Sequence, residues 1–383
     1  MNFDLAEDQV AVRDAVRELC TREFAPHAAR WDQEGAVPPS AVGRLAEQGF
    51  LGMAIPEEWG GVGYDARTVV VALEEIARVS AALAIMIAVH NSVGALPVFR
   101  FGTDEQRRRY LPRLVSKELA AFSLSEPGAG SDAGAIASSA RRDGDHYVLN
   151  GSKTWVTNGA QAGIYLIFAR TNREGGNRGI SAFIVESGTP GLVIGKPEDK
   201  MGLRGSDTVA LTLEDLRVPA DQRLGVEGEG FRIAMSMLDA GRIGVGAQAL
   251  GVMVAAFEEA VRYAQQRRAF GHEISRIQAV QWKLAEMERR IQCARLLIQR
   301  AAWLKDVGRP YSREASMAKL YASEAATWVT HQAIQVHGGY GYIKEYPVER
   351  YARDARVMEI YEGTSEIQRL VIARSLLKDG VRT

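Results

Sequence analysis

The chain contains very little cysteine: Cys20 and Cys293 are the only two in 383 residues. Two cysteines cannot form a disulfide framework or a four-cysteine zinc site. Both stand among residues typical of helices, so we expect two free thiols in a reducing compartment. The six histidines do not cluster, and His272-Glu273 lacks the second histidine of a zinc-binding helix, so no metal site is predicted.

The chain also lacks an excess of charge. It has 47 basic and 47 acidic side chains and a formal net charge of zero. This balance excludes a broadly basic nucleic-acid-binding protein and an acidic tail protein. The hydrophobic fraction of 46% and the charged fraction of 25% are ordinary for a soluble globular protein. At this length we expect two or three domains.

No targeting segment or long apolar run is visible. The N-terminus carries Asp4, Glu7 and Asp8, whereas a signal peptide needs basic residues followed by an apolar core. The most apolar stretch lies near Ala81–Val89, far short of the roughly 20 residues that span a bilayer. We therefore expect a soluble, cytoplasmic protein without a membrane span and without a nucleic-acid partner.

Common catalytic motifs are missing as well. The sequence has no G-x-G-x-x-G turn for dinucleotides and no G-x-S-x-G nucleophile elbow. The run Gly151-Ser152-Lys153-Thr154 lacks the earlier glycine of a phosphate-binding P-loop. The chemistry of the protein must therefore be carried by less general motifs.

What is present divides the chain into three segments. Residues 1–120 read as a helical domain with a short helix at Ala41–Gln48, a glycine-rich loop at Pro56–Tyr64 and a long buried helix over Thr68–Ala88. Residues 121–223 change character and contain short runs of β-forming residues between Gly, Asn, Asp and Pro clusters. These runs are Tyr147–Leu149, Ile164–Phe168, Ile180–Val185 and Val209–Leu213. The pattern predicts a small antiparallel β-barrel or sandwich.

Residues 226–383 are helical again. Apolar residues recur at spacings of three and four from Val280 to Ala301, which is the seam of a bundle helix. Long helical stretches are predicted at Gly228–Gln265 and Arg313–Val336. The predicted fold is therefore mainly α with a central β domain: an N-terminal helical domain, a middle β domain and a C-terminal four-helix bundle.

Five polar, glycine-rich strings stand out from ordinary linkers. They are LSEPGAGSDAG (124–134), WVTNG (155–159), RRAFG (267–271), QVHGGYGY (335–342) and IYEGTSEIQRLVIAR (360–374). Taken singly, each could be a turn, a hairpin or a helix cap. Taken together, several Gly/Ser/Thr-rich helix entrances indicate a large anionic ligand, because free backbone N–H groups there bind phosphate oxygens.

These strings, in this order, resemble the acyl-CoA dehydrogenase family. The strings MGLRGSDT (201–208) and LDAGR (238–242) match as well, and the resemblance covers essentially the whole chain. The sequence is most similar to the short-chain, butyryl-CoA-type branch. The resemblance implies the helix–β–helix architecture and a homotetramer built as a dimer of dimers.

The resemblance further implies FAD bound between the β domain and the bundle, without a Rossmann fold. Ser125 and Thr157 would hydrogen-bond the flavin ring, Thr157 near N5, and Trp155 would pack on it. The implied FAD-binding residues are Phe122, Leu124, Ser125, Gly130, Ser131, Trp155, Val156, Thr157, Arg267, Phe270, Gln278, Gln335, Gly338, Gly339, Thr364 and Glu366. Arg267, Gln278, Gln335, Gly338 and Gly339 would reach the FAD of a neighbouring subunit, whereas Thr364 and Glu366 would approach the phosphate and adenine portion. Ala269 departs from members that carry a hydroxyl residue there, which removes one possible pyrophosphate contact.

By resemblance, Glu362 of the YEG step is the catalytic base. The chemistry agrees, because removing a weakly acidic α-proton beside a thioester needs a carboxylate in a dry pocket. A second branch of the family places its base at the position of Gly241, where a glycine cannot serve. The alternative is a purely structural role, in which the negative charge of Glu362 interacts favourably with the dipole at the N-terminus of the following helix.

The implied substrate-binding residues are Ser131, Asp239, Arg242 and Gly363. A structural ion pair within the bundle is the alternative for Arg242.

The resemblance thus implies FAD-dependent α,β-dehydrogenation of a short-chain acyl-CoA to the trans-2-enoyl-CoA, with electrons passed to an electron-transfer flavoprotein. Alternatives are a relative acting on a branched or carrier-protein-tethered acyl thioester, a non-catalytic flavoprotein module, and an oxidase, although such oxidases are usually longer. A glutaryl-CoA-type enzyme is less expected, because Leu83–Val89 lacks the arginine that would hold a distal carboxylate. The sequence leaves open the acyl chain length, the choice between CoA and carrier protein, and the electron acceptor.

Overall fold

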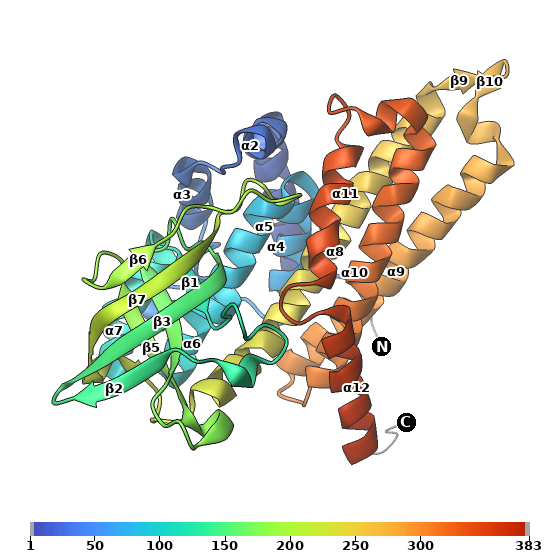
Figure 1. Cartoon of the computed structure of the whole chain (residues 1–383). Helices are drawn as coiled ribbons and strands as arrows, with labels where there is room; N and C mark the ends of the chain where they lie inside the picture. The colour runs from blue at the N-terminus through green and yellow to red at the C-terminus, as the bar shows by residue number, and fades with distance from the viewer. Residues whose placement is uncertain (1–3, 380–383) are drawn as a thin grey trace.

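The computed structural model describes residues 4–379 and has the predicted helix–β–helix order (Figure 1). The N-terminal helices pack on one another, and all but the last of them share an apolar core with the helices of the C-terminal part. These helices are α1 (Glu7–Leu19), α2 (Ala28–Glu34), α3 (Pro39–Glu47), α4 (Ala66–Val79), α5 (Ala81–Val89), α6 (Leu96–Phe101) and α7 (Asp104–Ser116).

The single long helix predicted over Thr68–Ala88 is wrong, because the chain breaks at Ser80. Ser80 is extended, with φ −146° and ψ 104°, and its hydroxyl accepts a hydrogen bond from the Leu83 N–H at 3.2 Å. A serine side chain in this position caps the N-terminus of the following helix, so α4 ends and α5 begins in a new direction.

The apolar run that starts at α5 is longer than expected. It continues as helix through a π-helical turn at His90–Ala95 into α6, so Ala81–Phe101 is 21 residues long. This segment and α8 (Gly230–Gln266) are long and apolar enough to cross a membrane by length and composition alone. However, 89% and 83% of their most apolar windows are buried inside the protein, as in core helices.

The β domain is an eight-stranded sheet in the order β6-β7-β3-β2-β4-β5-β8, with β1 also paired to β4. Its strands are β1 (Ala120–Ser123), β2 (Ser139–Asp143), β3 (His146–Thr157), β4 (Ile164–Arg170), β5 (Ile180–Glu186), β6 (Leu192–Ile194), β7 (Thr208–Pro219) and β8 (Arg223–Leu224). All four predicted β runs are strands. Most neighbouring strands pair antiparallel, as predicted, but β1 and β2 each pair parallel with β4.

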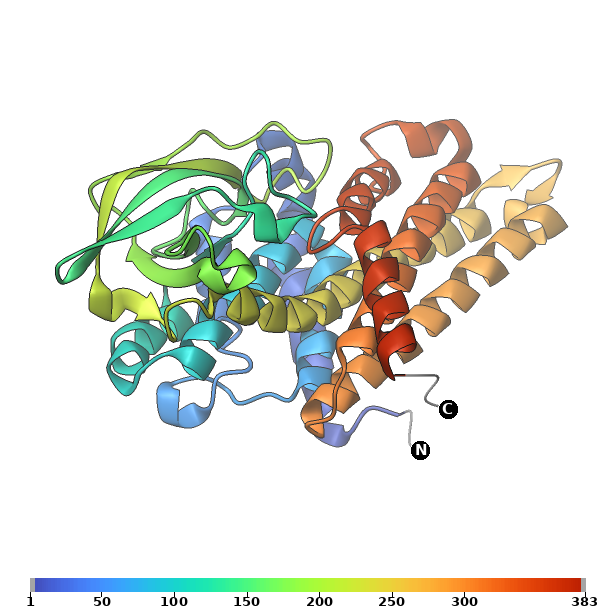
Figure 2. The same cartoon turned by 60° about the horizontal axis from the view of Figure 1, so that its bottom comes forward.

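Two apolar cores position the β domain. One lies within the domain and includes Tyr147, Phe183 and Leu211, and the other includes Phe168 of β4 and Ile233 of α8. The second core fixes the sheet against α7 and the start of α8. Figure 2 shows α8 running from beneath the β domain into the helical bundle. This helix therefore connects the two regions that carry the predicted site residues.

The C-terminal part is the predicted helical bundle. Besides α8 it contains α9 (Gln278–Asp306), α10 (Ser312–His337), α11 (Val348–Arg356) and α12 (Ser365–Asp379), with a small hairpin of β9 (Arg268–Ala269) and β10 (His272–Glu273) between α8 and α9. The apolar seam of α9 is buried at Met287, Ile291 and Ala294, as its periodicity predicts. The β9–β10 hairpin lies at the end of the bundle far from the β domain (Figure 1).

Candidate active site and cofactor surfaces

Glu362 lies on a turn just before α12 in an uncommon backbone conformation. Its φ is +50°, and the following Gly363 has a φ of +93°. A positive φ at a glutamate costs free energy, and such outliers cluster at functional sites. Its Oε2 atom is closed to solvent and has no hydrogen-bond partner within residues 4–379. The side chain thus presents a carboxylate oxygen that the fold itself does not use.

The free oxygen of Glu362 faces Gly241 on α8. A Cβ atom added to Gly241 would overlap Oε2 of Glu362. The glycine therefore leaves the space in which the carboxylate lies, although the two residues are 121 positions apart in the sequence. This placement argues against a charge that merely favours the N-terminus of α12, since Glu366 occupies the first turn of that helix.

The surroundings of Glu362 oppose its ionisation. Burial raises the pKa of the Glu362 carboxyl to about 7, and the positive charges of Arg242 and Lys319 only partly counteract this effect. The Lys319 side chain is completely buried, and its Nζ donates a hydrogen bond to the Gly363 carbonyl oxygen at 2.7 Å. A carboxyl with a pKa near neutrality can both accept and hold a proton at physiological pH.

Arg242 lies beside the same site, in an ion pair. Its Nη1 is 2.6 Å from Oδ1 of Asp239, which also accepts a hydrogen bond from the Ser312 hydroxyl at 2.9 Å. The structural ion pair that the sequence left as an alternative is therefore present. Nevertheless, Nε of Arg242 is buried without a partner among the described residues, so one donor is not used by the pair. The predicted substrate residue Ser131 is exposed on the loop after β1.

The β domain brings together one group of the predicted cofactor residues. The Thr154 N–H donates to the Ser125 carbonyl oxygen at 3.0 Å, which joins the LSEPG loop to β3. Trp155 has a φ of +60° at an irregularity of β3, and its side chain is 66% exposed. Bulges of this kind redirect a side chain away from the regular face of a sheet. Among the residues described, the hydroxyls of Ser125 and Thr157 form no hydrogen bond with the protein.

The remaining predicted contacts of this group are less exposed: Leu124 and Val156 are buried, and Phe122 packs partly against both the N-terminal and the β-domain cores. Gly130 is exposed on the same loop as Ser131.

A buried ion pair that sequence reasoning missed fixes this group. Lys153 of β3 donates from Nζ to Glu126 Oε1 at 2.7 Å and to the Leu124 carbonyl oxygen at 3.2 Å. Glu126 in turn accepts hydrogen bonds from the backbone N–H groups of Ala137 and Ser138. The sequence does draw attention to both residues, because Glu126 lies inside the 124–134 string and Lys153 lies just before the 155–159 string. Their pairing becomes visible only when the loop folds back on β3.

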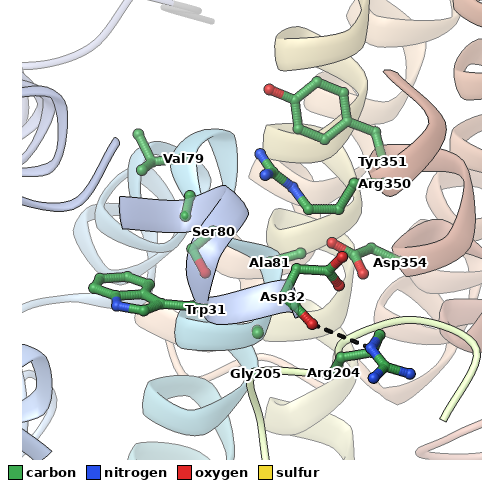
Figure 3. Close-up of a pocket in the computed structure, with 12 residues that line it drawn as sticks. Trp31, Asp32, Val79, Ser80, Ala81, Arg204, Gly205, Arg350, Tyr351 and Asp354 are labelled. Carbon is green, nitrogen blue, oxygen red and sulfur yellow. Dashed lines mark hydrogen bonds between the residues drawn. The ribbon is translucent and has the colours of Figure 1, made fainter. Parts of the chain in front are cut away.

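Hydrogen bonds also connect the MGLRGSDT loop (201–208) to the helices (Figure 3). The Leu203 N–H donates to Asp354 Oδ1 of α11 at 2.6 Å, and Arg204 Nε donates to the Asp32 carbonyl oxygen at 3.1 Å. Burial raises the pKa of Asp354 to about 6. The end of this loop, Asp207, accepts hydrogen bonds from the backbone of Ala160 and from Gln161. The loop therefore links α11 and α2 to the turn that follows Trp155–Thr157.

Another group of predicted cofactor residues lies elsewhere, near the β9–β10 hairpin. Arg267, Gly338 and Gly339 line a cavity of about 480 Å³ together with Tyr340. The Arg267 guanidinium lies over the Tyr340 ring, 5.4 Å from its centroid. Phe270 is 89% exposed on the hairpin, and Gln278 and Gln335 are exposed on the neighbouring helices. Within one chain this group does not meet the group around Ser125 and Trp155, because the β9–β10 hairpin lies at the end of the bundle far from the β domain (Figure 1).

Thr364 and Glu366, which also belong to the predicted cofactor set, lie at the start of α12. The Thr364 hydroxyl accepts a hydrogen bond from the Ile367 N–H at 3.3 Å, so the helix-cap interpretation of this step is also correct. Glu366 is exposed in the first turn of α12. Both residues are therefore near Glu362 in the chain and belong to neither of the groups described above.

Comparisons with known proteins agree with this arrangement. Three family profiles match consecutive parts of the chain: "Acyl-CoA dehydrogenase, N-terminal domain" at residues 6–118, "middle domain" at 121–216 and "C-terminal domain" at 228–377. The chain is 50% identical over 378 residues to the mitochondrial short-chain specific acyl-CoA dehydrogenase of Bos taurus, covering 98% of this chain and 92% of that one.

Two solved structures are also very similar. The butyryl-CoA dehydrogenase from Megasphaera elsdenii has a TM-score of 0.97 at 42% identity, covering 99% of this chain and 100% of that one. A chain from work on the electron transferring flavoprotein of Acidaminococcus fermentans has a TM-score of 0.98 at 45% identity, with coverages of 99% and 100%. The matched profiles and relatives place the chain among the oxidoreductases that act on a CH–CH group. The chain belongs to the acyl-CoA dehydrogenase family.

Proposed function

We propose that this protein oxidises a short-chain acyl-CoA to the trans-2-enoyl-CoA with FAD, and passes the electrons to an electron-transfer flavoprotein. The observation that carries the proposal is the Glu362 carboxylate, whose Oε2 is shielded from solvent, has no hydrogen-bond partner in the described part of the chain and faces the space left by Gly241. The similarity to the bovine short-chain enzyme and to the Megasphaera butyryl-CoA dehydrogenase supports the short-chain substrate, and the similarity to the Acidaminococcus chain supports the electron acceptor.

In this proposal Glu362 takes the α-proton of the thioester on Oε2. The closed surroundings keep water away from the carboxylate and hold its pKa near neutrality, so it is strong enough as a base and can retain the proton. A backbone N–H of the Glu362–Gly363 turn would donate a hydrogen bond to the thioester oxygen, where negative charge develops. Arg242, with its unused Nε, supplies positive charge beside the same site.

The residues of the β domain fit a flavin. Within residues 4–379 the hydroxyls of Ser125 and Thr157 have no partner, and they belong to the loop and the strand that meet next to the exposed Trp155; this combination suits a planar, polar ring system. When bound, FAD supplies the hydride acceptor for the β-hydrogen. The chain's own part is to hold the ring with Trp155 and to place hydrogen-bond donors at its edge, which Lys153 and Glu126 keep in position.

We infer that Arg267, Gln278, Gln335, Gly338 and Gly339 serve the FAD of a neighbouring subunit in a dimer of dimers. The support is their distance from the β-domain group within one chain, together with the cavity of about 480 Å³ that three of them line. The division into domains at 1–120, 121–223 and 226–383, the roles of Thr364 and Glu366, and a cytoplasmic location remain part of this proposal.

A short, neutral acyl group is supported by α5. All nine residues of this helix are apolar and buried, so it offers bulk but no partner for a distal carboxylate. Gln248 of α8 donates from Nε2 to the Ala81 carbonyl oxygen at 2.8 Å and accepts a hydrogen bond from the Tyr361 hydroxyl. These contacts close the region between the residue that precedes Glu362 and the start of α5.

The test combines a substrate panel with one substitution. Wild-type protein is mixed anaerobically with acyl-CoAs of four to sixteen carbons and with glutaryl-CoA, and flavin bleaching is followed. We expect the highest kcat/KM at four carbons or for a small branched relative. Glu362→Gln should retain FAD and bind substrate but reduce flavin at least about 10²–10⁴-fold more slowly. The exposed Glu57→Gln is the matched control. Normal reduction by Glu362→Gln would refute the base, and a maximum at eight or more carbons would refute the substrate class.

A further inference from the structure

We propose that Lys319 is a positioning residue for the base: it holds the main chain of the Glu362–Gly363 turn and supplies a compensating positive charge beside the carboxylate. The inference deepens the proposed function and rests on Glu362 being the base. Lys319 lies in the middle of α10 and belongs to none of the strings that the sequence analysis singled out.

The first observation is where the Lys319 ammonium is used. The side chain is completely buried, and Nζ donates a hydrogen bond to the Gly363 carbonyl oxygen at 2.7 Å. Burying an ammonium costs several kcal/mol unless it is paired. An uncharged side chain could fill the same space in a helix interior, so the position of this charge requires an explanation.

The second observation is the conformation that the hydrogen bond fixes. Glu362 and Gly363 both have positive φ angles, and the Gly363 carbonyl oxygen accepts a second hydrogen bond from Gln368 Nε2 at 2.8 Å. The Gln368 amide also donates to the Glu362 carbonyl oxygen at 3.2 Å. Two buried side chains from α10 and α12 therefore converge on a strained turn. A turn of this kind persists only when its surroundings over-determine it.

The third observation is the arrangement of charge around Lys319. The charged groups that face it are Glu362 on the turn, Arg242 on α8, Glu359 just before the turn, Glu324 on α10 and Glu366 at the start of α12. Burial lowers the pKa of Lys319 to about 8, so the side chain is still mostly protonated at neutral pH. Arg242 already forms an ion pair with Asp239, whereas no carboxylate among residues 4–379 makes a direct contact with the Lys319 ammonium. Lys319 is therefore well placed to stabilise the ionised form of Glu362.

The experiment measures how flavin reduction by a saturating acyl-CoA depends on pH. Lys319→Met removes both the charge and the hydrogen bond, and Lys319→Gln keeps an N–H donor but removes the charge. Losing a nearby cation raises the pKa of a carboxyl, so in both variants the acid limb of the pH profile should move up by about 1 pH unit. Reduction at pH 7 should then fall about 5-fold, because the ionised fraction of Glu362 drops as its pKa rises from about 7 by about 1 unit, and part of the loss should be recovered at higher pH.

Two controls separate this role from simple packing. Gln368→Leu removes the neutral donor to the same carbonyl oxygen, so it should lower the melting temperature but leave the acid limb in place. Lys283→Met removes a lysine that donates to Gln332 Oε1 at 2.6 Å between α9 and α10, away from the turn. It should leave the profile unchanged.

The inference is overturned if folded, FAD-containing Lys319→Met or Lys319→Gln has the wild-type acid limb. If Lys319→Met does not retain FAD, Lys319→Gln decides by the same criterion, and Lys319→Arg, which keeps charge and donors, should restore the wild-type limb. Failure of the proposed base is a separate outcome, since Glu362→Gln would then reduce flavin normally. A slow Glu362→Gln together with an unshifted Lys319 variant refutes only the role of Lys319.

Discussion

Lys153 and Glu126 form an ion pair that is almost completely closed to solvent, with side-chain exposures of 0% and 6% and an N–O distance of 2.7 Å. Burial lowers the pKa of Lys153 to about 8, whereas the hydrogen bonds and the charge of Lys153 hold the pKa of Glu126 below its usual range despite burial. The pair joins the loop of Ser125 to the strand of Trp155. Its contribution is therefore to the shape of the proposed flavin surface as well as to stability.

Lys153→Met should be strongly destabilising, because it leaves Glu126 charged and buried without its partner. Removing one member of a buried pair costs about 3–5 kcal/mol. Thermal melting and urea unfolding measure the loss, and the flavin-to-protein absorbance ratio should fall with it. The matched control is Lys196→Met, an exposed lysine of the same domain, which should stay within about 0.5 kcal/mol of wild type. An FAD-saturated Lys153→Met of wild-type stability would contradict this assignment.

Gly241→Ala should impair catalysis, because the new Cβ would overlap Oε2 of Glu362. The carboxylate must then move away from the substrate, and a displacement of about 1 Å can lower a rate about 10²-fold. Stopped-flow reduction of the flavin by substrate measures the effect. Gly244→Ala on the same helix is the control, since its added Cβ would meet other atoms only at 3.6 Å. Equal rates in the two variants would show that the space beside Gly241 is not needed.

The rate of flavin reduction should rise with pH through about 7. Glu362 must be ionised to accept a proton, and burial raises its pKa to about 7 in the folded protein. Below this pH the protonated fraction grows, and the rate should fall about 10-fold per pH unit. The measurement is kcat/KM between pH 5 and 9, which reports the free enzyme. An acid limb near pH 4.5, the usual value for a glutamate, would mean that the carboxyl is solvated.

The raised pKa of Glu362 also predicts that its ionisation lowers the stability of the folded protein. A carboxyl whose pKa is raised on folding stabilises the folded state fully below its unfolded value of 4.5, and this contribution is lost as the pH rises through about 7. Gln cannot ionise, so Glu362→Gln should be more stable than wild type at pH 8, by at most about 3 kcal/mol. At pH 4.5 the difference should nearly vanish. Melting temperatures at the two pH values test this, and an equal difference at both would rule out ionisation as its cause.

Retention of FAD should depend on assembly. Arg267 lies at the end of the bundle far from the β domain, so its proposed FAD contact requires a second subunit. Arg267→Ala removes a charge-assisted contact of about 1.5–3 kcal/mol, and FAD should bind about 10–100-fold more weakly. Arg262→Ala, which pairs with Glu259 on the same helix, is the control. Light scattering measures the oligomeric state, and flavin absorbance measures how much FAD is bound. A stable monomer saturated with FAD would contradict the proposal.

Individual helices and strands could be predicted from the sequence better than the breaks between them and the way they pair. The periodicity from Val280 to Ala301 identifies α9, because a seam that packs on one side leaves a regular trace. The break at Ser80 was missed, since apolar residues continue on both sides and a serine can also stand inside a helix. The parallel pairing of β1 with β4 was missed for another reason: pairing direction depends on how the chain crosses the sheet, which local composition does not record.

The candidate site divides in the same way. Glu362 is predicted as the base from the string around it, but its free oxygen, its left-handed backbone and its neighbour Lys319 depend on segments packed together from α8, α10 and the turn. The Lys153–Glu126 pair likewise joins residues 27 positions apart across a loop. Such contacts are decided by tertiary structure, so residue types alone could not predict them.

The overlap between a side chain at 241 and the carboxylate of Glu362 also constrains how this enzyme can evolve. In the branch of the family that carries its base at the position of Gly241, the base has in effect changed place. A lineage starting from this sequence cannot acquire a second base at 241 while Glu362 keeps its position, because both would occupy one volume. Each single substitution therefore passes through an impaired intermediate, and the two positions must change as a coordinated pair. Sequences between the two branches should accordingly be rare, and variants with a glutamate at both positions should be poor enzymes.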